Sequence, residues 1–324
     1  MQFSVIIPAK NEEANIGKCL DSINGQAWDK SQYEVIIVDN GSSDRTVEIA
    51  RGKGATVYVK PELTISGLRN FGAGQAVGKI LAFMDADCTV DSHWLSEAAR
   101  YLDRDEVVCF GSPPVVPANA TWVQNAWFLV RRKHTVAGET EWLESMNMFV
   151  RRDDFAKCGG FDEELVTCED YDLSLRLKKF GLLLNDSRIV AVHHGEAATV
   201  GHFFRKEIWR GISNFRGLMQ HGIILREIPS LIAPPAHCLL LAAGVLAPFF
   251  HRSTSSRAAF LLLLVWQLAL LVLSLRKIER QNAPALAVQL YWLLNVYFLA
   301  RGLAIFRGIS RRNGTGKVVT RCAE

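Results

Sequence analysis

Two carboxylates separated by a single residue follow directly after an apolar run. Asp85 and Asp87 flank Ala86 and come after Ile80–Met84, a stretch that predicts a buried strand. A carboxylate pair at this spacing can hold a hard divalent cation and leave coordination positions open for phosphate oxygens. The same pair also occurs in solvated turns at strand ends. The strand that precedes it here favours a cation site.

A second acidic cluster contains Glu169, Asp170 and Asp172 and stands at the start of a predicted helix that Gly181 ends. Carboxylates are common in the first turn of a helix because the helix dipole and the free amides stabilise them there. Capping alone can therefore explain the cluster. The functional alternative is a general base that accepts the proton of an attacking hydroxyl group.

The segment Gly67–Gly78 is rich in glycine and contains G-x-G-x-x-x-G. No strand runs directly into it, so it lacks the context of a dinucleotide-binding turn, and the chain has no G-x-x-x-x-G-K-[ST] phosphate loop. Small residues here predict a helix that packs closely on a sheet. Arg69 within it would be free to meet a phosphate group.

His193 and His194 follow a further predicted strand and precede Gly195 and Glu196. Most histidines in folded proteins have a structural role. A histidine near two acidic clusters can also complete the ligand shell of a metal ion. Both interpretations are open from the sequence.

The elements that must position these residues are short strands that alternate with helices. Strands are predicted at Phe3–Pro8, Tyr33–Asp39, Thr56–Val59, Ile80–Met84 and Met146–Val150, and helices at 14–23, 44–51, 66–77, 93–102 and 170–180. This alternation predicts an α/β domain with a largely parallel sheet, although strands and helices alternate less regularly in the sequence after Gly111. Because ligands bind outside the carboxyl ends of such strands, Asp39 and Asp85 should converge on one crevice.

The composition excludes several classes of protein. With 49% hydrophobic and 22% charged residues, the chain is expected to fold, and 37 Lys+Arg against 33 Asp+Glu is too small an excess to indicate a nucleic-acid partner. The seven cysteines include no C-x-x-C pair, which argues against a zinc site or a disulfide framework. The N-terminus lacks the basic region and cleavage site of a signal peptide, so the catalytic part is expected in the cytoplasm.

The sequence predicts three regions, namely a catalytic domain at 1–220, a membrane region at 229–306 and a basic tail at 307–324. Ala258–Leu275 and Pro284–Phe306 are each long enough to span a bilayer. Pro229–Phe250 is a third candidate, but its prolines suggest a kinked span or a re-entrant segment. A helix near 201–217, with interleaved aromatic and basic residues, suits a membrane interface, and an ordinary amphipathic core helix is the alternative.

The number of spans stays open at this point. The basic tail favours the cytoplasm, which requires an even number of spans if the catalytic domain is cytoplasmic. Arg276, Lys277 and Arg280, between the last two candidate spans, favour the opposite arrangement.

Four motifs, taken in order, resemble the family 2 glycosyltransferases. They lie over roughly the first 217 residues and comprise Pro8-Ala9-Lys10-Asn11-Glu12-Glu13, Val38-Asp39-Asn40-Gly41-Ser42, Arg69-Asn70-x-Gly72 leading to Asp85-Ala86-Asp87, and Gly159-Gly160-Phe161-Asp162-Glu163 followed by Glu169-Asp170. The resemblance implies the GT-A fold, a Rossmann-like α/β domain that binds a nucleotide sugar, here followed by transmembrane helices.

The resemblance also implies roles for individual residues. Pro8, Glu12 and Asp39 would form the nucleotide-binding wall for a UDP- or GDP-sugar, and Arg69 would help to hold the donor. Asp85 and Asp87 would hold Mg²⁺ or Mn²⁺ against the diphosphate, Asp87 more directly. Asp170 resembles the catalytic base, with Glu169 in support, and His193 resembles a metal-associated histidine, for which His194 is an alternative. Asn40 departs from the aspartate that many members carry, which leaves the nucleotide open.

These implications predict an inverting, metal-dependent hexosyltransferase of the multi-pass inner-membrane type, with a cytoplasmic catalytic domain and no nucleic-acid partner. The acceptor would be a hydroxyl group of a lipid-linked saccharide or glycan in envelope polysaccharide assembly, guided by Phe203, Phe204 and Trp209. Trp209-Arg210 does not reproduce the Q-x-x-R-W motif of processive polymerases, which favours transfer of a single sugar. A polyprenyl-phosphate sugar synthase, a nucleotide-sugar hydrolase and a non-catalytic membrane partner are the alternatives.

Overall fold

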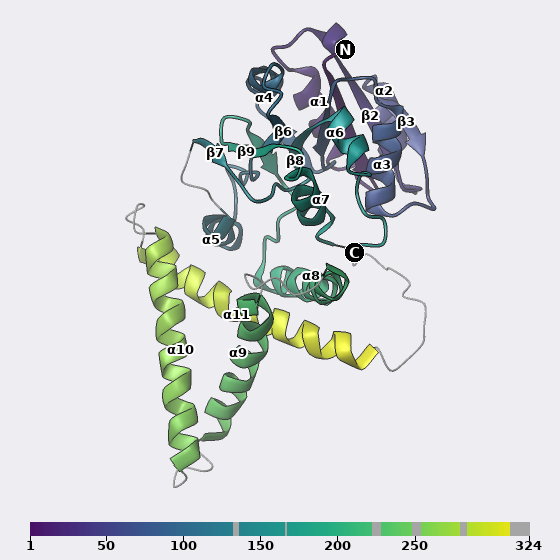
Figure 1. Cartoon of the computed structure of the whole chain (residues 1–324). Helices are drawn as coiled ribbons and strands as arrows, with labels where there is room; N and C mark the ends of the chain where they lie inside the picture. Colours follow the sequence, from purple (N-terminus) through teal and green to yellow (C-terminus); the bar gives the residue numbers. More distant parts are fainter. Residues whose placement is uncertain (132–135, 166, 222–227, 248–253, 279–283, 312–324) are drawn as a thin grey trace. The chain divides into compact units, whose positions relative to one another are not determined.

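The computed structural model describes residues 1–131, 136–165, 167–221, 228–247, 254–278 and 284–311. The chain divides into two compact units (Figure 1). The first unit comprises residues 1–120 and 131–196, and the second comprises 121–130 and 197–324. Each has its own hydrophobic core.

The first unit is built on an eight-stranded sheet with the order β3-β2-β1-β4-β8-β6-β9-β7. Its strands are β1 (Phe3–Ala9), β2 (Tyr33–Asp39), β3 (Thr56–Val59), β4 (Ile80–Met84), β6 (Val107–Gly111), β7 (Ala137–Glu139), β8 (Asn147–Arg151) and β9 (Leu182–Asp186). Two short strands, β5 (Cys88–Val90) and β10 (Ala191–His193), form a separate pair. The predicted α/β class is confirmed.

The expected parallel arrangement holds for only part of the sheet. β1 pairs in parallel with β2 and β4, and β2 pairs in parallel with β3. By contrast, β8 runs antiparallel to β4 and β6, and β7 runs antiparallel to β9. The sheet is therefore mixed, because the chain after Gly111 lacks the strand–helix alternation that forces parallel crossovers.

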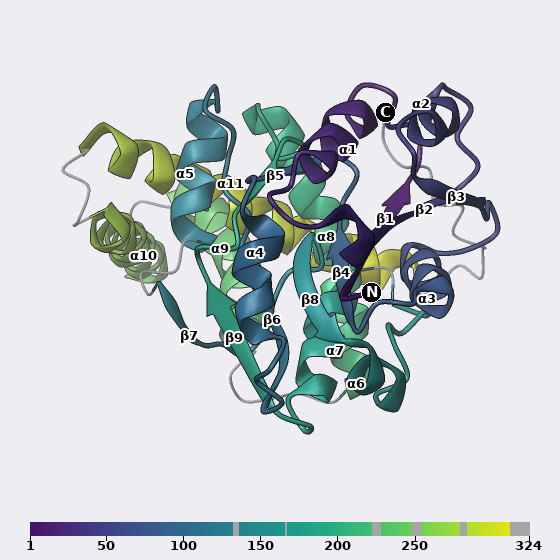
Figure 2. The ribbon, with the colours of Figure 1, turned by 90° about the horizontal axis from the view of Figure 1, so that it is seen from above.

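Helices cover both faces of this sheet (Figures 1 and 2). α1 (Ile16–Asn24), α2 (Thr46–Gly52) and α4 (Trp94–Ala98) pack in one buried cluster, and α3 (Ile65–Gln75), α6 (Arg152–Lys157) and α7 (Glu169–Leu177) pack in the other. Short 3₁₀ turns lie at Lys30–Gln32 and Ala99–Tyr101. Both faces of the central strands are buried, which explains why their sequences are continuous apolar runs.

Glycines bring α3 close to the sheet, as predicted. A Cβ atom at Gly72 would lie 2.5 Å from Ile6 Cγ2 of β1, and one at Gly78 would lie 2.5 Å from the Phe3 carbonyl carbon. Only residues without a side chain fit at such separations. The close approach sets the height of Arg69, one turn before Gly72, relative to the strand ends.

The described part of the second unit is helical. It contains α5 (Trp122–Arg131), α8 (Val200–His221), α9 (Ile228–Leu246), α10 (Thr254–Ile278) and α11 (Pro284–Arg311). Its core is formed by α5, the start of α8 and α11, with Val123, Ala126, Phe203, Leu290 and Leu293 among its buried members. Phe203 packs against Trp127 with ring centroids 4.9 Å apart and is buried, so it is not placed to guide a lipid as we had expected.

Three helices of this unit are long and apolar enough to cross a membrane, over Pro229–Leu246, Thr254–Ile278 and Pro284–Ile305. The first of these was expected to be interrupted by its prolines. Instead α9 continues as a helix through Pro234 and Pro235.

Candidate active site

The parallel strands place acidic residues at one edge of the sheet. β1, β2 and β4 end side by side, with Ala9 opposite Asp39 in the register and Asp85 immediately after β4. Glu12 follows β1 at the same edge. Burial and the nearby carboxylates Asp87 and Asp85 raise the pKa of Glu12, although its hydrogen bond from Asn15 opposes them. Asp39 and Asp85 therefore lie at the same edge of the sheet, as predicted.

The pairing of β5 with β10 brings a histidine to the second aspartate. His193 lies opposite Cys88 in this antiparallel pair, so it comes next to Asp87. Its Nε2 lies 3.1 Å from Asp87 Oδ2, and its Nδ1 lies 3.2 Å from Glu196 Oε1. Burial lowers the pKa of His193, but the hydrogen bonds to Asp87 and Glu196 outweigh burial and raise it to about 9. His194 instead places its Nε2 2.9 Å from Thr89 Oγ1.

Gly195 allows the chain to close over Asp87. A Cβ atom at this position would overlap Asp87 Oδ2 and would lie 3.1 Å from His193 Nε2. The backbone amide of His194 donates to the carbonyl oxygen of Asp87 at 3.0 Å, which holds the segment in place. Any side chain at residue 195 would displace the carboxylate.

Asp87, Cys88 and His193 each offer one ligand atom within 4.8 Å of the others. A carboxylate oxygen and an imidazole nitrogen suit Mn²⁺, and the carboxylate also suits Mg²⁺. Glu196 would orient the ring of His193 from its other nitrogen, as partners of ligand histidines do. Burial, with the negative charges of Asp85 and Asp87, raises the pKa of Cys88, so this residue stays a neutral thiol and a weak ligand for such ions. The residues present fit a hard or borderline divalent cation.

Arg69 links the two acidic clusters. Its two terminal nitrogens lie 2.8 Å from Asp85 Oδ1 and 2.8 Å from Glu169 Oε1, and its side chain is only 4% exposed. Burial lowers the pKa of Arg69, but the two carboxylates outweigh this effect and raise it, so the residue stays charged. We had expected this guanidinium to be free, and it is instead engaged at both ends. Its Nε is buried without a hydrogen-bond partner among the described residues.

Asp170 lies beside this bridge at the start of α7. Its Oδ1 accepts a 2.8 Å hydrogen bond from the amide of Tyr171, and Oδ2 accepts a longer one, 3.4 Å, from the amide of Ser145. Burial and the charge of Glu169 raise the pKa of Asp170 to about 7, against the opposing effect of Arg69. A carboxyl group with this pKa exchanges protons readily near neutral pH.

Asp39 and Asn40 organise the turn after β2. The buried Asp39 carboxylate accepts hydrogen bonds from the amide and the hydroxyl group of Ser42. Asn40 donates to the carbonyl oxygens of Lys60, Pro61 and Leu63 at 2.9–3.2 Å. The asparagine that departs from the family pattern therefore ties this turn to the loop after β3.

The Gly159–Glu163 motif is anchored to α3. Asn70 donates to the carbonyl oxygen of Phe161 and accepts from its amide, both at 2.9 Å, and it also donates to Glu163 Oε1 at 2.9 Å. Gly160 has φ +73°, a conformation that glycine adopts without strain. These contacts hold the segment that leads to Glu169 and Asp170 against the helix that carries Arg69.

Comparison with known proteins gives the family. The sequence model of glycosyl transferase family 2 matches residues 4–159. The chain is 31% identical over 239 residues to the glycosyltransferase AglE of Haloferax volcanii, a match that covers 70% of this chain and 78% of AglE. The chain belongs to glycosyl transferase family 2. The beta-monoglucosyldiacylglycerol synthase of Trichormus variabilis is 30% identical over 193 residues, which cover 54% of this chain and 40% of that one.

Solved structures agree with the fold. The mannosyltransferase PcManGT from Pyrobaculum calidifontis, in complex with GDP-Man and Mn²⁺, has a TM-score of 0.62 at 17% identity, and the match covers 95% of this chain and 87% of that one. Residues 1–349 of S. aureus TarS, in complex with UDP, have a TM-score of 0.50 at 18% identity, covering 97% and 92%. The GT-A fold expected from the motifs is confirmed. This family 2 protein is a glycosyltransferase that uses a nucleotide-sugar donor.

Sequence reasoning missed three contributors to this site, Cys88, Glu196 and Ser145. Cys88 directly follows Asp87, and Glu196 lies three residues after His193, so sequence proximity was a signal for both. Ser145 had no such signal, because it lies 25 positions away from its partner Asp170 in the sequence.

Proposed function

We propose that this glycosyltransferase moves a hexosyl group, with inversion, from a nucleoside-diphosphate sugar to a hydroxyl group of a membrane lipid or lipid-linked saccharide. The observation that carries this proposal is the bridge of Arg69 between Asp85 and Glu169. It joins the candidate metal ligands around Asp87 to the candidate general base Asp170 in one site. A site of this kind has one part for the leaving diphosphate and another for the attacking hydroxyl.

Asp87 and His193 would hold the cation, with Asp85 close by and Glu196 fixing the histidine ring. A bound Mg²⁺ or Mn²⁺ would stabilise the negative charge that develops on the departing diphosphate. Arg69, fixed by two carboxylates, holds Asp85 in position and adds its own positive charge near the leaving group. Glu12 and Asp39, at the adjoining strand ends, would border the nucleotide, and Pro8 would form part of the wall beneath it.

Asp170 would act as the general base. As the acceptor oxygen forms its bond to the anomeric carbon, the bond from that carbon to the diphosphate oxygen breaks, and the acceptor proton passes to Asp170. A pKa of about 7 keeps a large share of this carboxyl group ionised at neutral pH and still able to hold the proton. One displacement reverses the anomeric configuration, so an α-linked donor gives a β-linked product.

The acceptor is assigned to the membrane because of the second unit. Three of its helices are long and apolar enough to cross a bilayer. The name of the Trichormus variabilis relative also describes a glycolipid product. We further propose an inner-membrane location with the catalytic residues 1–220 in the cytoplasm and envelope polysaccharide assembly as the setting.

The test is the release of nucleoside diphosphate by the full-length protein in mild detergent. A panel of UDP- and GDP-sugars is offered with Mn²⁺, Mg²⁺ or a chelator, with and without a membrane lipid extract, beside Asp87→Ala and Asp170→Asn. We expect release that needs both metal and lipid and that both variants lose. Tight donor binding without release from any donor would contradict the proposal and indicate a non-catalytic partner.

The main alternative, a polyprenyl-phosphate sugar synthase, gives a different pattern. A phosphate acceptor is already ionised and needs less help from a base. Lipid-dependent release that survives in Asp170→Asn would therefore support this alternative. Release of free sugar without lipid would support a hydrolase.

A further inference from the structure

α11 differs from the other two candidate spans in how much of it is covered by protein. Among the described residues, 33% of the 18-residue apolar stretch of α11 is buried by protein. The value is 11% for the corresponding stretches of α9 and α10. The mean hydropathy of α11 is 1.3, below 1.6 for α9 and 2.5 for α10. A helix that spans alone should resemble α10, whose surface is apolar along its length, with Leu261, Val265 and Leu268 each at least 60% exposed.

The first half of α11 packs against α5. Ala287 and Leu290 are buried in the same cluster as Val123 and Ala126. Farther along, Tyr297 lies with its ring centroid 5.2 Å from that of Trp127. Both ends of α5 continue directly into the chain of the catalytic unit, and the helix is only ten residues long. A helix of that length and connection cannot cross a bilayer.

The second half of α11 packs against α8. Ala300 and Ala304 are buried with Ile208, and a Cβ atom at Gly211 would lie 2.7 Å from that of Ala304. Between them, the fully buried Glu207 carboxylate accepts hydrogen bonds from Arg210 at 2.8 Å and Arg301 at 2.9 Å.

α8 cannot enter the hydrocarbon core. It carries Arg205, Lys206, Glu207 and Arg210 within six residues, and charged side chains are strongly disfavoured at the centre of a bilayer. α5 packs against the first half of α11 and α8 against the second half. α11 must therefore lie at the same depth in the membrane as α5 and α8. We propose that α9 and α10 alone cross the membrane, and that α5, α8 and α11 form a layer that lies along the bilayer surface on the catalytic side.

α9 and α10 would form a membrane hairpin, and their contacts with α5 and α11 agree with this layer. Ile278, at the end of α10, belongs to the core that α5 and α11 share, and Lys277 Nζ donates to the carbonyl oxygen of Val130 at 3.4 Å. A Cβ atom at Gly302 of α11 would overlap Cys238 Sγ and would lie 2.7 Å from the carbonyl oxygen of Pro234, both on α9. α11 therefore crosses α9 between Pro234 and Cys238, and it also reaches α10, where Tyr291 donates a hydrogen bond to Gln267 at 2.7 Å.

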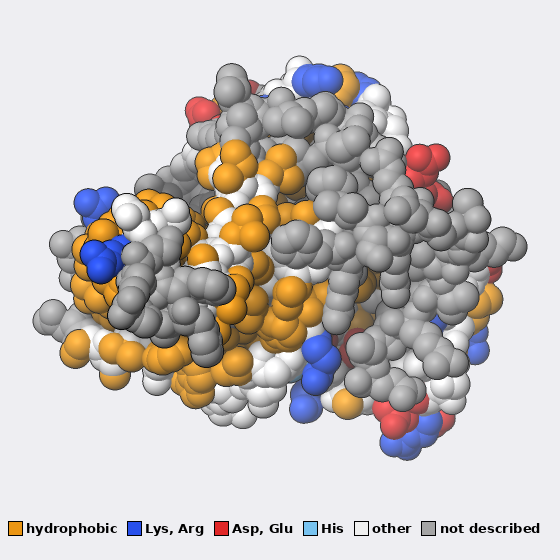
Figure 3. Space-filling model, turned by 90° about the horizontal axis from the view of Figure 1, so that it is seen from below, with side chains coloured by type: hydrophobic (Ala, Val, Ile, Leu, Met, Phe, Trp, Pro, Cys, Tyr) orange, Lys and Arg blue, Asp and Glu red, His pale blue; other side chains and the backbone are white. Residues whose placement is uncertain are grey.

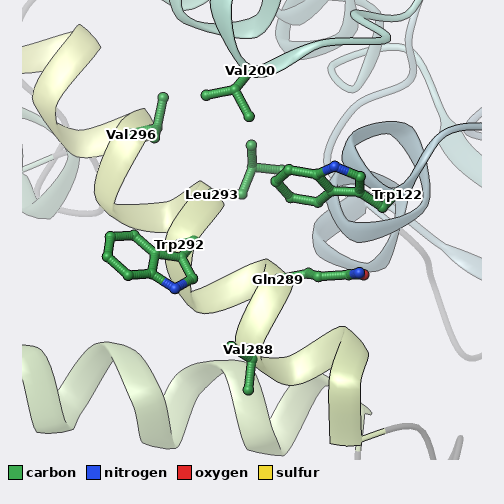
Figure 4. Close-up of a pocket in the computed structure, with 7 residues that line it drawn as sticks. All are labelled: Trp122, Val200, Val288, Gln289, Trp292, Leu293 and Val296. Carbon is green, nitrogen blue, oxygen red and sulfur yellow. The ribbon is translucent and has the colours of Figure 1, made fainter.

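The surface of the layer has the chemistry of a membrane interface. Trp122, Trp209 and Trp292 are 41%, 51% and 62% exposed, and tryptophan is enriched at the headgroup level of bilayers. Trp122 and Trp292 line an apolar hollow of about 330 Å³ with residues of α8 and α11 (Figure 4). Hydrophobic side chains gather on one face of the molecule in Figure 3. Lipid chains are the partner that this surface fits.

The arrangement also resolves the conflict between the basic segments. With two spans, Arg226, Arg276, Lys277, Arg280 and the tail all lie on the catalytic side, and Arg252 and Arg257 lie at the opposite end of the hairpin. Basic residues near span ends are in excess on the cytoplasmic side. The polar sequence from His251 to Arg257 must reach the far headgroups, which requires the hairpin to cross completely.

The first test labels single added cysteines in the full-length protein within intact cells, using a membrane-impermeant maleimide. The positions are Ser255 at the start of α10, Asn282 between α10 and α11, Asn313 in the tail, and the exposed Lys30 of the catalytic unit as the reference. We expect Asn282→Cys, Asn313→Cys and Lys30→Cys to share one side and Ser255→Cys to lie on the other. Asn313→Cys on the side opposite to Lys30→Cys would show three spans and overturn the proposal. The wild-type chain measures labelling of its own cysteines.

A second test measures depth and does not depend on labelling of the tail. Spin labels are placed at exposed positions in reconstituted vesicles, in matched sets at Leu261, Leu268 and Leu275 of α10 and at Val288, Trp292 and Leu303 of α11. We expect the middle label of α10 to be the deepest of its set and the three labels of α11 to lie at similar depth near the headgroups. If Val288→Cys and Leu303→Cys instead report opposite leaflets, α11 crosses the membrane and the proposal fails.

Discussion

The two ends of the active site surround a carboxylate with neighbours of opposite charge. Asp87 lies against His193, whose pKa is raised to about 9, and a cation bound by the His193 ring would take the place of that proton. Asp170 lies beside the negative Glu169 in an enclosed position, and its pKa is raised to about 7. Arg69, between the two ends, forms its ion pairs with Asp85 and Glu169, and its charge only partly opposes the rise in the pKa of Asp170.

This contrast separates two kinds of chemistry within one site. A carboxylate beside a positive partner stays ionised and suits the binding of a cation, whereas a desolvated carboxyl group beside another carboxylate suits proton transfer. The two assignments make different predictions for the same substitution, so each can be tested separately.

The largest effect is expected for Asp87→Ala. Losing the main cation ligand should lower transfer by roughly 10⁴-fold, because charge on the leaving diphosphate is no longer stabilised. The rate is measured with a saturating donor over a range of Mn²⁺ concentrations. Asp91→Asn, four residues later with a carboxylate that is 51% exposed, is the matched control and should retain activity. An Asp87→Ala enzyme of normal rate would remove the cation assignment.

Asp170→Asn should have the next largest effect. Removing a general base should lower the rate by about 10³-fold while donor binding stays close to that of the wild type, because the amide keeps the shape of the carboxyl group. Single-turnover rates and donor affinity are measured side by side. Asp153→Asn, an exposed aspartate on α6, is the control. A loss of donor affinity equal to the loss of rate would assign Asp170 to binding instead.

Gly195→Ala sharpens the cation end without removing a ligand. The added methyl group overlaps Asp87 Oδ2 and should reduce metal affinity by roughly 10–100-fold, the range seen when groups that orient ligands are disturbed. Mn²⁺ titration followed by calorimetry gives the affinity. Gly201→Ala, where a Cβ atom meets nothing within 4 Å, is the control. Unchanged affinity in Gly195→Ala would mean that the cation binds away from Asp87.

The pH dependence should report Asp170. Its carboxyl group takes up a proton as the pH falls through about 7, and only the ionised form is a base, so the rate should fall by roughly tenfold between pH 8 and pH 6. Burial raises this pKa most, Glu169 raises it further, and Arg69 lowers it. The residual activity of Asp170→Asn should lack this step. A step that persists in that variant would belong to another group.

Much of the catalytic half could be predicted from the sequence, because its signals are local. The strands at Tyr33–Asp39, Thr56–Val59 and Ile80–Met84 have the predicted bounds, since each is a short β-branched or apolar run that ends at a turn. The family motifs also indicated which acids share an edge. The antiparallel β8 and the strands β6, β7 and β9 were missed or misjudged because nothing local sets the direction of a strand that enters the sheet after a long excursion.

The site was less predictable where long-range pairing decides it. Arg69 was identified, but its engagement with Glu169 joins residues 100 positions apart and has no local signal. The choice of His193 over His194 depends on the register of β5 with β10. A slip of one residue in that pair would have exchanged the two side chains between its faces.

The excursion of residues 121–130 into the second unit decides how the protein can be cut. Val123, Ala126 and Leu129 of α5 are at most 4% exposed, because α8 and α11 cover them. A fragment that stops after Glu196 would keep these residues but lose the helices that cover them. The apolar face of α5 would then be exposed to water and would favour aggregation. A soluble catalytic fragment therefore needs two edits, a stop after residue 196 and a short polar linker in place of 121–130.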